Sequence, residues 1–244
     1  MEKILNFQLS LFGGFVDLKP ETDIIIKLLT NLSSEKFVPS TVDVAILDAL
    51  TKKITSESRI QMISQDKQWS VVFLADRIDI NYEYNGEATI YNNFDDVVNY
   101  SNILLSKVFL TFPETKGNRL AMNCRVLLNI CNSEEVVKFT TRFSTPLSLY
   151  GDLFPTEWSV RWNVRDKIKI NDENSEICNR ITELSMINFA DESGSSSRIV
   201  AILDTNTLAE NVINRFKYDN LADFSQNAKE YMSKVLLEVE KNDQ

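Results

Sequence analysis

Side chains able to carry out acid–base or nucleophilic chemistry are scarce in this sequence, because it contains no histidine. Ser-His-Asp and Cys-His nucleophilic sites and His-ligated metal sites are therefore excluded. The six glycines form neither a Gly-x-Gly-x-x-Gly nor a Gly-x4-Gly-Lys-Ser/Thr sequence, so the known phosphate-binding loops are also missing. The sequence thus predicts a protein that is not an enzyme and that needs no cofactor.

Carboxylates remain as candidates for general acid or base chemistry. Five aspartates stand at the ends or turns of predicted elements: Asp76, Asp79, Asp95, Asp96 and Asp204. Each also has a structural interpretation, since aspartate suits turns, strand ends and the first turn of a helix. A carboxylate–metal nuclease could use Asp17 with Lys19, but no second acid follows at a useful spacing. We predict no catalytic and no metal-binding residues.

The sequence has three cysteines, Cys124, Cys131 and Cys178, which cannot pair into a closed disulfide framework. An odd number of thiols fits a reducing compartment. On one continuous strand Cys124 and Cys131 would face opposite sides, and no Cys-x-x-Cys pair occurs, which disfavours a zinc site. We therefore interpret all three as structural thiols. Without a secretory signal or a long apolar segment, the sequence predicts a cytoplasmic protein.

Net charge bears on the choice of partner. The chain has 35 acidic and 26 basic side chains, a formal charge of −9. This balance disfavours nucleic acid, which is bound by neutralising its phosphates. It favours a protein partner with a basic surface, docked on an acidic surface of this chain. One local exception is a basic cluster of Arg161, Arg165, Lys167 and Lys169. This cluster is either a partner-binding site or a solvated outer face.

Hydrophobic periodicity predicts the elements that would position these groups. In the first half, alternation predicts a strand at residues 4–11, and helical spacing predicts a helix at 43–54. A meander of three antiparallel strands and a long helix then follow, at residues 59–64, 69–74, 77–84 and 93–110.

A similar order recurs after Gly117. The sequence predicts strands at residues 119–130, 158–164, 177–189 and 198–205, a flexible loop at 191–197, and a long helix at 220–239. The inward faces of the strands of both halves should bury five large side chains: Trp69, Phe73, Ile80, Trp158 and Trp162.

The two long helices match each other. Aligned without gaps, residues 93–110 and 220–237 share six identities and the same apolar stripe, although any two amphipathic helices can be slid into such a match. Because each helix also closes a meander, we interpret the chain as two related halves, residues 1–116 and 117–244, packed as one unit. The predicted fold class is α+β, a duplicated antiparallel β-meander followed by a long helix.

Short motifs carry a resemblance to a known family. These are Trp69-Ser-Val-Val-Phe73, Asp76-Arg-Ile-Asp-Ile-Asn-Tyr82, Arg119-Leu-Ala-Met-Asn123 and Arg198-Ile-Val-Ala-Ile-Leu-Asp204. They resemble a sporadically distributed bacterial family with no established activity. Its halves, a meander plus a helix, are similar in outline to the export chaperone SecB, which presents apolar grooves to unfolded chains. The resemblance implies a fold and only suggests a function.

Three functions remain open. The leading hypothesis is a non-enzymatic protein-interaction module, an accessory or subunit of a bacterial defence or toxin-neutralising system. The alternatives are a SecB-like holdase chaperone and a metal-dependent hydrolase that uses carboxylates alone. A protein partner is expected in the first case, and a homo-oligomer is compatible with all three.

Overall fold

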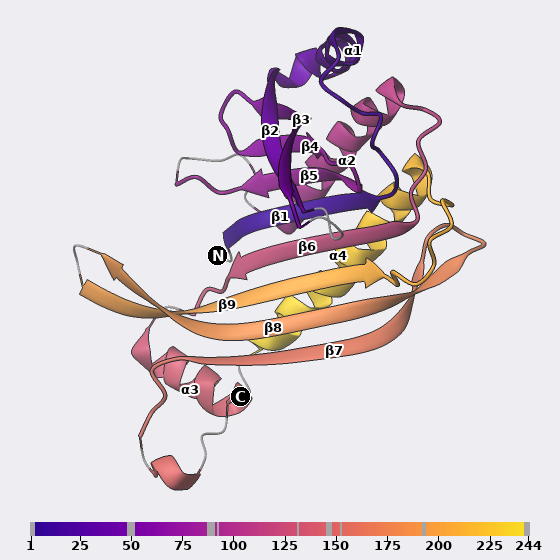
Figure 1. The fold of residues 1–244 in the computed structure, drawn as a ribbon. Helices are drawn as coiled ribbons and strands as arrows, with labels where there is room; N and C mark the ends of the chain where they lie inside the picture. Colours follow the sequence, from indigo (N-terminus) through magenta and orange to yellow (C-terminus); the bar gives the residue numbers. More distant parts are fainter. Residues whose placement is uncertain are drawn as a thin grey trace.

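A twisted antiparallel sheet of nine strands forms the centre of the molecule (Figure 1). In this computed structural model the structure describes residues 3–47, 52–86, 91, 93–130, 132–144, 148–151, 153–191 and 194–241. The order of the strands across the sheet is β2-β3-β4-β5-β1-β6-β9-β8-β7. In chain order they are β1 (Lys3–Phe12), β2 (Phe37–Leu47), β3 (Ile54–Ser64), β4 (Trp69–Phe73), β5 (Arg77–Glu83), β6 (Arg119–Leu127), β7 (Trp158–Lys169), β8 (Ser175–Asp191) and β9 (Gly194–Thr207).

The strand order is similar on the two sides of the central pair of β1 and β6, with four strands beyond β1 and three beyond β6. On one side β1 is followed by β5 and the meander back to β2, and on the other β6 is followed by β9 and the meander back to β7. The α+β class and the two antiparallel meanders, each followed in the chain by a long helix, are therefore confirmed. A duplicated unit would produce this order, and the duplication itself stays a prediction.

All four α-helices of the described residues pack on one face of the sheet. The two long helices contact each other, and they lie behind the sheet in Figure 1. The Asn93 side chain caps α2 by accepting a hydrogen bond from the Asp96 amide, which would otherwise have no partner in the first turn of the helix. The helices are α1 (Thr22–Leu32), α2 (Phe94–Thr111), α3 (Ser133–Phe143) and α4 (Tyr218–Glu240).

The core lies between this helical layer and the sheet. Alternate residues of β4 and β6 are buried, as period-two alternation predicts. The apolar stripe of α2 is buried, and the matching positions of α4 are buried or packed against the core. Lys229 of α4 and Asp95 of α2 form an ion pair of 2.7 Å that joins the two helices. Trp69, Phe73 and Ile80 are buried, as predicted.

Several sequence predictions are wrong. The helix predicted at residues 43–54 is contradicted by those that the structure describes: residues 43–47 belong to β2 and Ile54 begins β3. The two strands pair along their full length, from Phe37↔Ser64 to Leu47↔Ile54. The apolar spacing in this segment fitted a helix, but pairing of two strands decides the structure. Helices α1 and α3 were missed. The start of α3 could have been predicted from the sequence, because Asn132 is a typical helix-capping residue and accepts a hydrogen bond from the Glu135 amide.

Three further corrections concern the second half. Trp162 is 43% exposed because β7 is an edge strand that the helices only partly cover, and Trp158 is partly buried. Most of the predicted loop at 191–197 belongs to the paired ends of β8 and β9. Asp204 does not end its strand, since β9 continues to Thr207.

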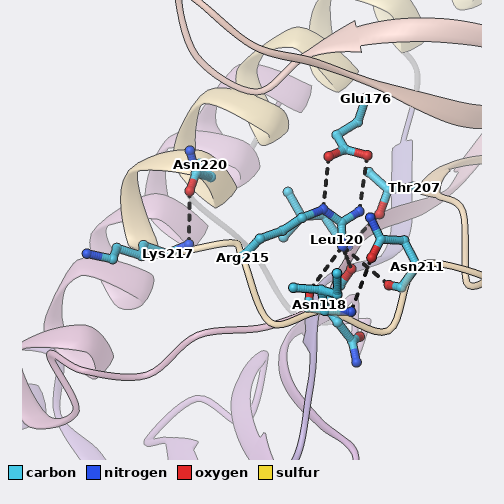
Figure 2. A network of polar contacts seen from close by, with 9 residues as sticks. Asn118, Leu120, Glu176, Thr207, Asn211, Arg215, Lys217 and Asn220 are labelled. Atoms are coloured by element: carbon cyan, nitrogen blue, oxygen red, sulfur yellow. Dashed lines mark hydrogen bonds and ion pairs between the residues drawn. The ribbon is translucent and has the colours of Figure 1, made fainter.

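A polar network around Arg215 anchors the connection from β9 to α4 (Figure 2). The guanidinium donates two hydrogen bonds to the carboxylate of Glu176, at 2.9 and 3.1 Å, and a third to the carbonyl of Asn118 at 2.6 Å. Gly117 and Phe216 form a β-bridge beside it. This network ties the start of β6 to β8 and to the segment that leads into α4.

Candidate functional site

The face of the sheet opposite the helices carries two neighbouring rows of mainly polar residues. Strand pairing places one residue of each strand in a continuous row across this uncovered face. From β5 to β7, one row contains Asp79, Ser10, Ala121, Asn206, Asn179 and Arg165. The next row contains Asn81, Gln8, Asn123, Asp204, Ile181 and Asn163. We refer to this surface, from β5 to β7, as the uncovered face.

Hydrogen bonds link side chains along these rows. Ser10 donates to Asp79 at 2.6 Å, and Arg77 donates to the same carboxylate at 2.8 Å. Asp79 is buried although it lies on this face, since its neighbours enclose it. Arg119 donates to the side-chain carbonyl of Asn206 at 3.1 Å. Such paired polar groups hold their side chains in fixed positions on a rigid sheet.

Basic side chains outnumber acidic ones on the uncovered face. By strand register, its described cations include Arg77, Arg119, Arg125, Arg161, Arg165, Lys167, Lys169 and Arg198. By the same register its described acids are Asp79, Glu83, Glu183 and Asp204, and Asp76 and Glu210 lie beside Arg77 and Arg165 from neighbouring segments. Because the whole chain has a formal charge of −9, positive charge is segregated onto this face and the remaining surface is strongly negative.

The predicted basic cluster lies at the outer edge of this face. Arg161, Arg165, Lys167 and Lys169 are at alternate positions of β7 and are exposed. Arg161 lies 3.9 Å from a Glu183 oxygen and Arg165 3.9 Å from a Glu210 oxygen, so both ion pairs are loose. The structure joins these residues to Arg119, Arg125 and Arg77, which sequence reasoning missed. Their positions on neighbouring strands follow from strand order, which local sequence does not reveal.

Arg125 provides a hydrogen-bond donor on the uncovered face that has no acceptor among the described residues. Its Nε atom is buried, and within the described residues it has no hydrogen-bond partner. A buried donor without an acceptor is costly, and an oxygen supplied by a bound partner would relieve that cost. The arrangement as a whole can bind anions through several fixed guanidinium groups, and guanidinium geometry suits carboxylates.

Asp204 gives a testable pH dependence. Burial raises the pKa of Asp204, while the Asn206 hydrogen bond and the charges of Arg119 and Arg161 oppose the rise. The folded protein therefore holds this proton more tightly than the unfolded chain, and stability should fall as pH rises from the unfolded pKa through the folded pKa. Asp204→Asn should reduce that fall and leave stability equal or higher at neutral pH. Urea unfolding between pH about 4 and 7 measures it. A variant less stable at neutral pH would contradict it.

The fold does not bring the other candidate catalytic or metal-binding side chains together among the described residues. Among the described residues, no group of three or more Cys, Asp or Glu side chains is placed to hold a metal. Cys124 and Cys178 are buried, and burial raises the pKa of the Cys178 thiol. Cys131 lies outside the described residues. Asp95 and Asp96 lie in the first turn of α2, and Asp76 lies in the turn before β5, as their structural interpretations predicted.

A concave region lies beside the first meander. This cavity of about 310 Å³ is lined partly by Trp69, Tyr91, Tyr100, Glu35 and Asp66. The three rings contact one another, with centroids 4.9 to 5.3 Å apart, so they pack together and do not enclose a space between them. Burial raises the pKa of Tyr91 to about 12. We interpret the cluster as core packing.

None of the helices in the described part of the chain is long and apolar enough to span a membrane. Comparison of the chain with protein-family models, with curated proteins and with solved structures finds no match in any of the three. Any function assigned to the uncovered face therefore rests on its geometry and charge alone.

Proposed function

We propose that this chain is a non-enzymatic protein-interaction module that docks an acidic surface of a partner protein on its uncovered face. The observation that carries the proposal is the concentration of cations on one face of a chain whose formal charge is −9. Fixed arginines on a sheet recognise carboxylates with defined geometry, and they steer an acidic partner towards the correct face. A role as an accessory or subunit of a bacterial defence or toxin-neutralising system fits such a module.

An acidic protein explains this face better than nucleic acid does. The acidic residues on the uncovered face, together with the negative remainder of the molecule, would repel an extended phosphate backbone that runs beyond the face. A protein partner can instead match the alternation of Arg, Asn and Asp side chains point by point. Homo-oligomerisation through other surfaces is compatible with this function.

Charge reversal on the uncovered face tests the proposal. Arg161→Glu with Arg165→Glu should abolish recovery of the partner in affinity purification from the native host, because two cations become repulsive anions. Both side chains are more than half exposed, so the fold should be kept. Because Arg161 faces Glu183 on β8, the double variant should lose stability by at most about 1 kcal/mol. The partner bound by the wild type should also have an acidic surface that cross-links to β6, β7 or β8.

A matched variant controls for net charge. Lys27→Glu with Lys234→Glu makes the same change on α1 and α4, away from the uncovered face, and should leave the partner bound. If both double variants keep the partner, or both lose it with folding intact, the uncovered face is not the docking surface.

A holdase chaperone is the second candidate. The observation in its favour is the exposure of Trp162 and Val164 on the helical side of β7, which leaves apolar surface for an unfolded client. The polar rows of the uncovered face do not offer such surface. Suppression of aggregation of an unfolded client by the wild type, lost in Trp162→Ser with Val164→Ser, would favour the holdase over the docking module.

A further inference from the structure

The outer edge of β7 receives no backbone hydrogen bond from another described strand, although side chains occupy its last part. The Lys167 N–H donates to Asp166, and the carbonyls of Lys167 and Lys169 accept from Arg180 and Asn227. Strand β7 ends the sheet and pairs only with β8, over all twelve residues from Trp158↔Met186 to Lys169↔Ser175. Outside this pairing, no described residue makes a backbone-to-backbone hydrogen bond to β7. From Ser159 to Arg165, alternate N–H and C=O groups point away from the sheet and have no partner among the described residues, as required for addition of another strand.

The two faces of β7 differ sharply in chemistry. Arg161, Arg165, Lys167 and Lys169 are exposed on the uncovered face, and Lys167 and Lys169 form no ion pair with another described residue. On the helical face Trp162 and Val164 are 43% and 52% exposed. The ring of Phe143 lies edge-on to Trp162, at 6.2 Å between centroids, and continues this apolar surface.

This pattern specifies the neighbour that β7 can accept. Opposite charges directly across two strands stabilise pairing, and apolar pairs do the same on the other face. An added strand with acidic residues at alternate positions and apolar residues between them satisfies both faces at once. Such a strand would also place carboxylates beside the loosely paired Arg161 and Arg165.

A second copy of β7 is a poor neighbour. An antiparallel pair related by a two-fold axis at Asn163 sets Arg161 of each copy opposite Arg165 of the other, and a shift of the axis to Arg165 sets Arg161 opposite Lys169. Like charges directly opposite destabilise a pair. The cations thus block self-association through this edge and leave it open to an acidic strand.

The strand at the other edge of the sheet lacks this selectivity. The described side chains of β2 on the same sheet face are uncharged: Val38, Ser40, Val42 and Val44. Charge complementarity therefore distinguishes β7 from β2. We infer that β7 binds an extended segment of a partner protein by strand addition, with alternating acidic and apolar residues in that segment. This inference rests on the proposed function and names the form of its partner.

A synthetic peptide tests strand addition. The probe is a labelled twelve-residue peptide in which glutamate alternates with valine or threonine, and its binding is followed by fluorescence anisotropy. The wild type should bind it, and Arg161→Glu with Arg165→Glu should weaken binding on the order of tenfold or more, because opposite-charge pairs become like-charge pairs. A peptide with lysine in place of glutamate should show the reverse preference.

Backbone methylation distinguishes strand addition from attraction between charges. In an added strand only alternate N–H groups face β7, so one form N-methylated at all glutamates and another N-methylated at all intervening residues should differ. One form should lose binding and the other should keep it. Amide hydrogen exchange should show new protection in β7 with the peptide that binds.

Each other outcome has a definite meaning. Equal binding of both methylated forms, with the charge-reversal effect retained, would overturn strand addition while leaving the basic docking face in place. Absence of binding by every acidic peptide would also overturn strand addition, and the proposed function would still be decided separately by partner recovery with the two charge-reversal variants. A scrambled peptide with all glutamates together should bind less than the alternating one, and equal binding would contradict the inference.

Discussion

Trp69→Ala should lower the free energy of unfolding by about 3–5 kcal/mol, which is typical for truncation of a buried aromatic side chain. The indole is 1% exposed at the centre of the first meander. Its ring contacts those of Tyr82, Tyr91 and Tyr100, with centroids 5.1, 5.3 and 4.9 Å away. The substitution removes all of these contacts and leaves a cavity between β4 and α2. Chemical denaturation followed by circular dichroism measures the loss.

Trp162→Ala is the matched control, since it removes the same side chain from an edge strand. Its indole is 43% exposed, and the change in unfolding free energy should stay below about 1 kcal/mol. The sequence pattern alone had predicted that both tryptophans are buried. A loss at Trp162 as large as that at Trp69 would mean that the helical face of β7 is covered in solution, and the strand edge would then not be free.

Arg59→Met should lower the free energy of unfolding by about 2–4 kcal/mol, because it leaves buried carbonyl groups without donors. Arg59 is 1% exposed, and it donates to the carbonyls of Phe15, Val16 and Phe73 at 2.6, 3.2 and 3.2 Å. Methionine retains most of the length and apolar bulk of the side chain, so the loss reports on the hydrogen bonds and on the 3.5 Å ion pair between Arg59 and Glu57. Denaturant unfolding gives the magnitude.

The effect of Arg59→Met should also be local. The amides of Gly13 and Phe15 donate to the carbonyls of Asp76 and Ala75, and the arginine holds this segment in place. Hydrogen exchange at these two amides should accelerate in Arg59→Met more than exchange in β6. Arg165→Met, at an exposed position of β7, should change neither stability nor these amides. Unchanged exchange at Gly13 and Phe15 would show that the loop is held by other contacts.

Local sequence was sufficient for elements with a strong period of their own. The meander of β3, β4 and β5 alternates apolar and polar residues between polar turns, and a sheet needs that alternation when one of its faces is buried. Helix α2 begins at Asn93 and keeps one apolar stripe buried, which also made it predictable. The prediction for residues 43–54 was wrong because their apolar spacing fits both the helical and the strand period. Only pairing with a neighbouring strand selects between the two.

For function, the sequence by itself determined which chemistry is missing: without histidine, Ser-His-Asp, Cys-His and His-ligated metal sites cannot form. It also found the basic cluster, because those residues are close together in the chain. Only the tertiary structure decided that Arg77 of β5, Arg119 and Arg125 of β6, and the cluster on β7 share one face. The physical reason is that side-chain alternation sets two faces for each strand, whereas strand order and register, which depend on contacts distant in sequence, decide which faces meet. Burial at the sheet edge follows the same rule, and Trp162 is exposed because no strand lies beyond β7.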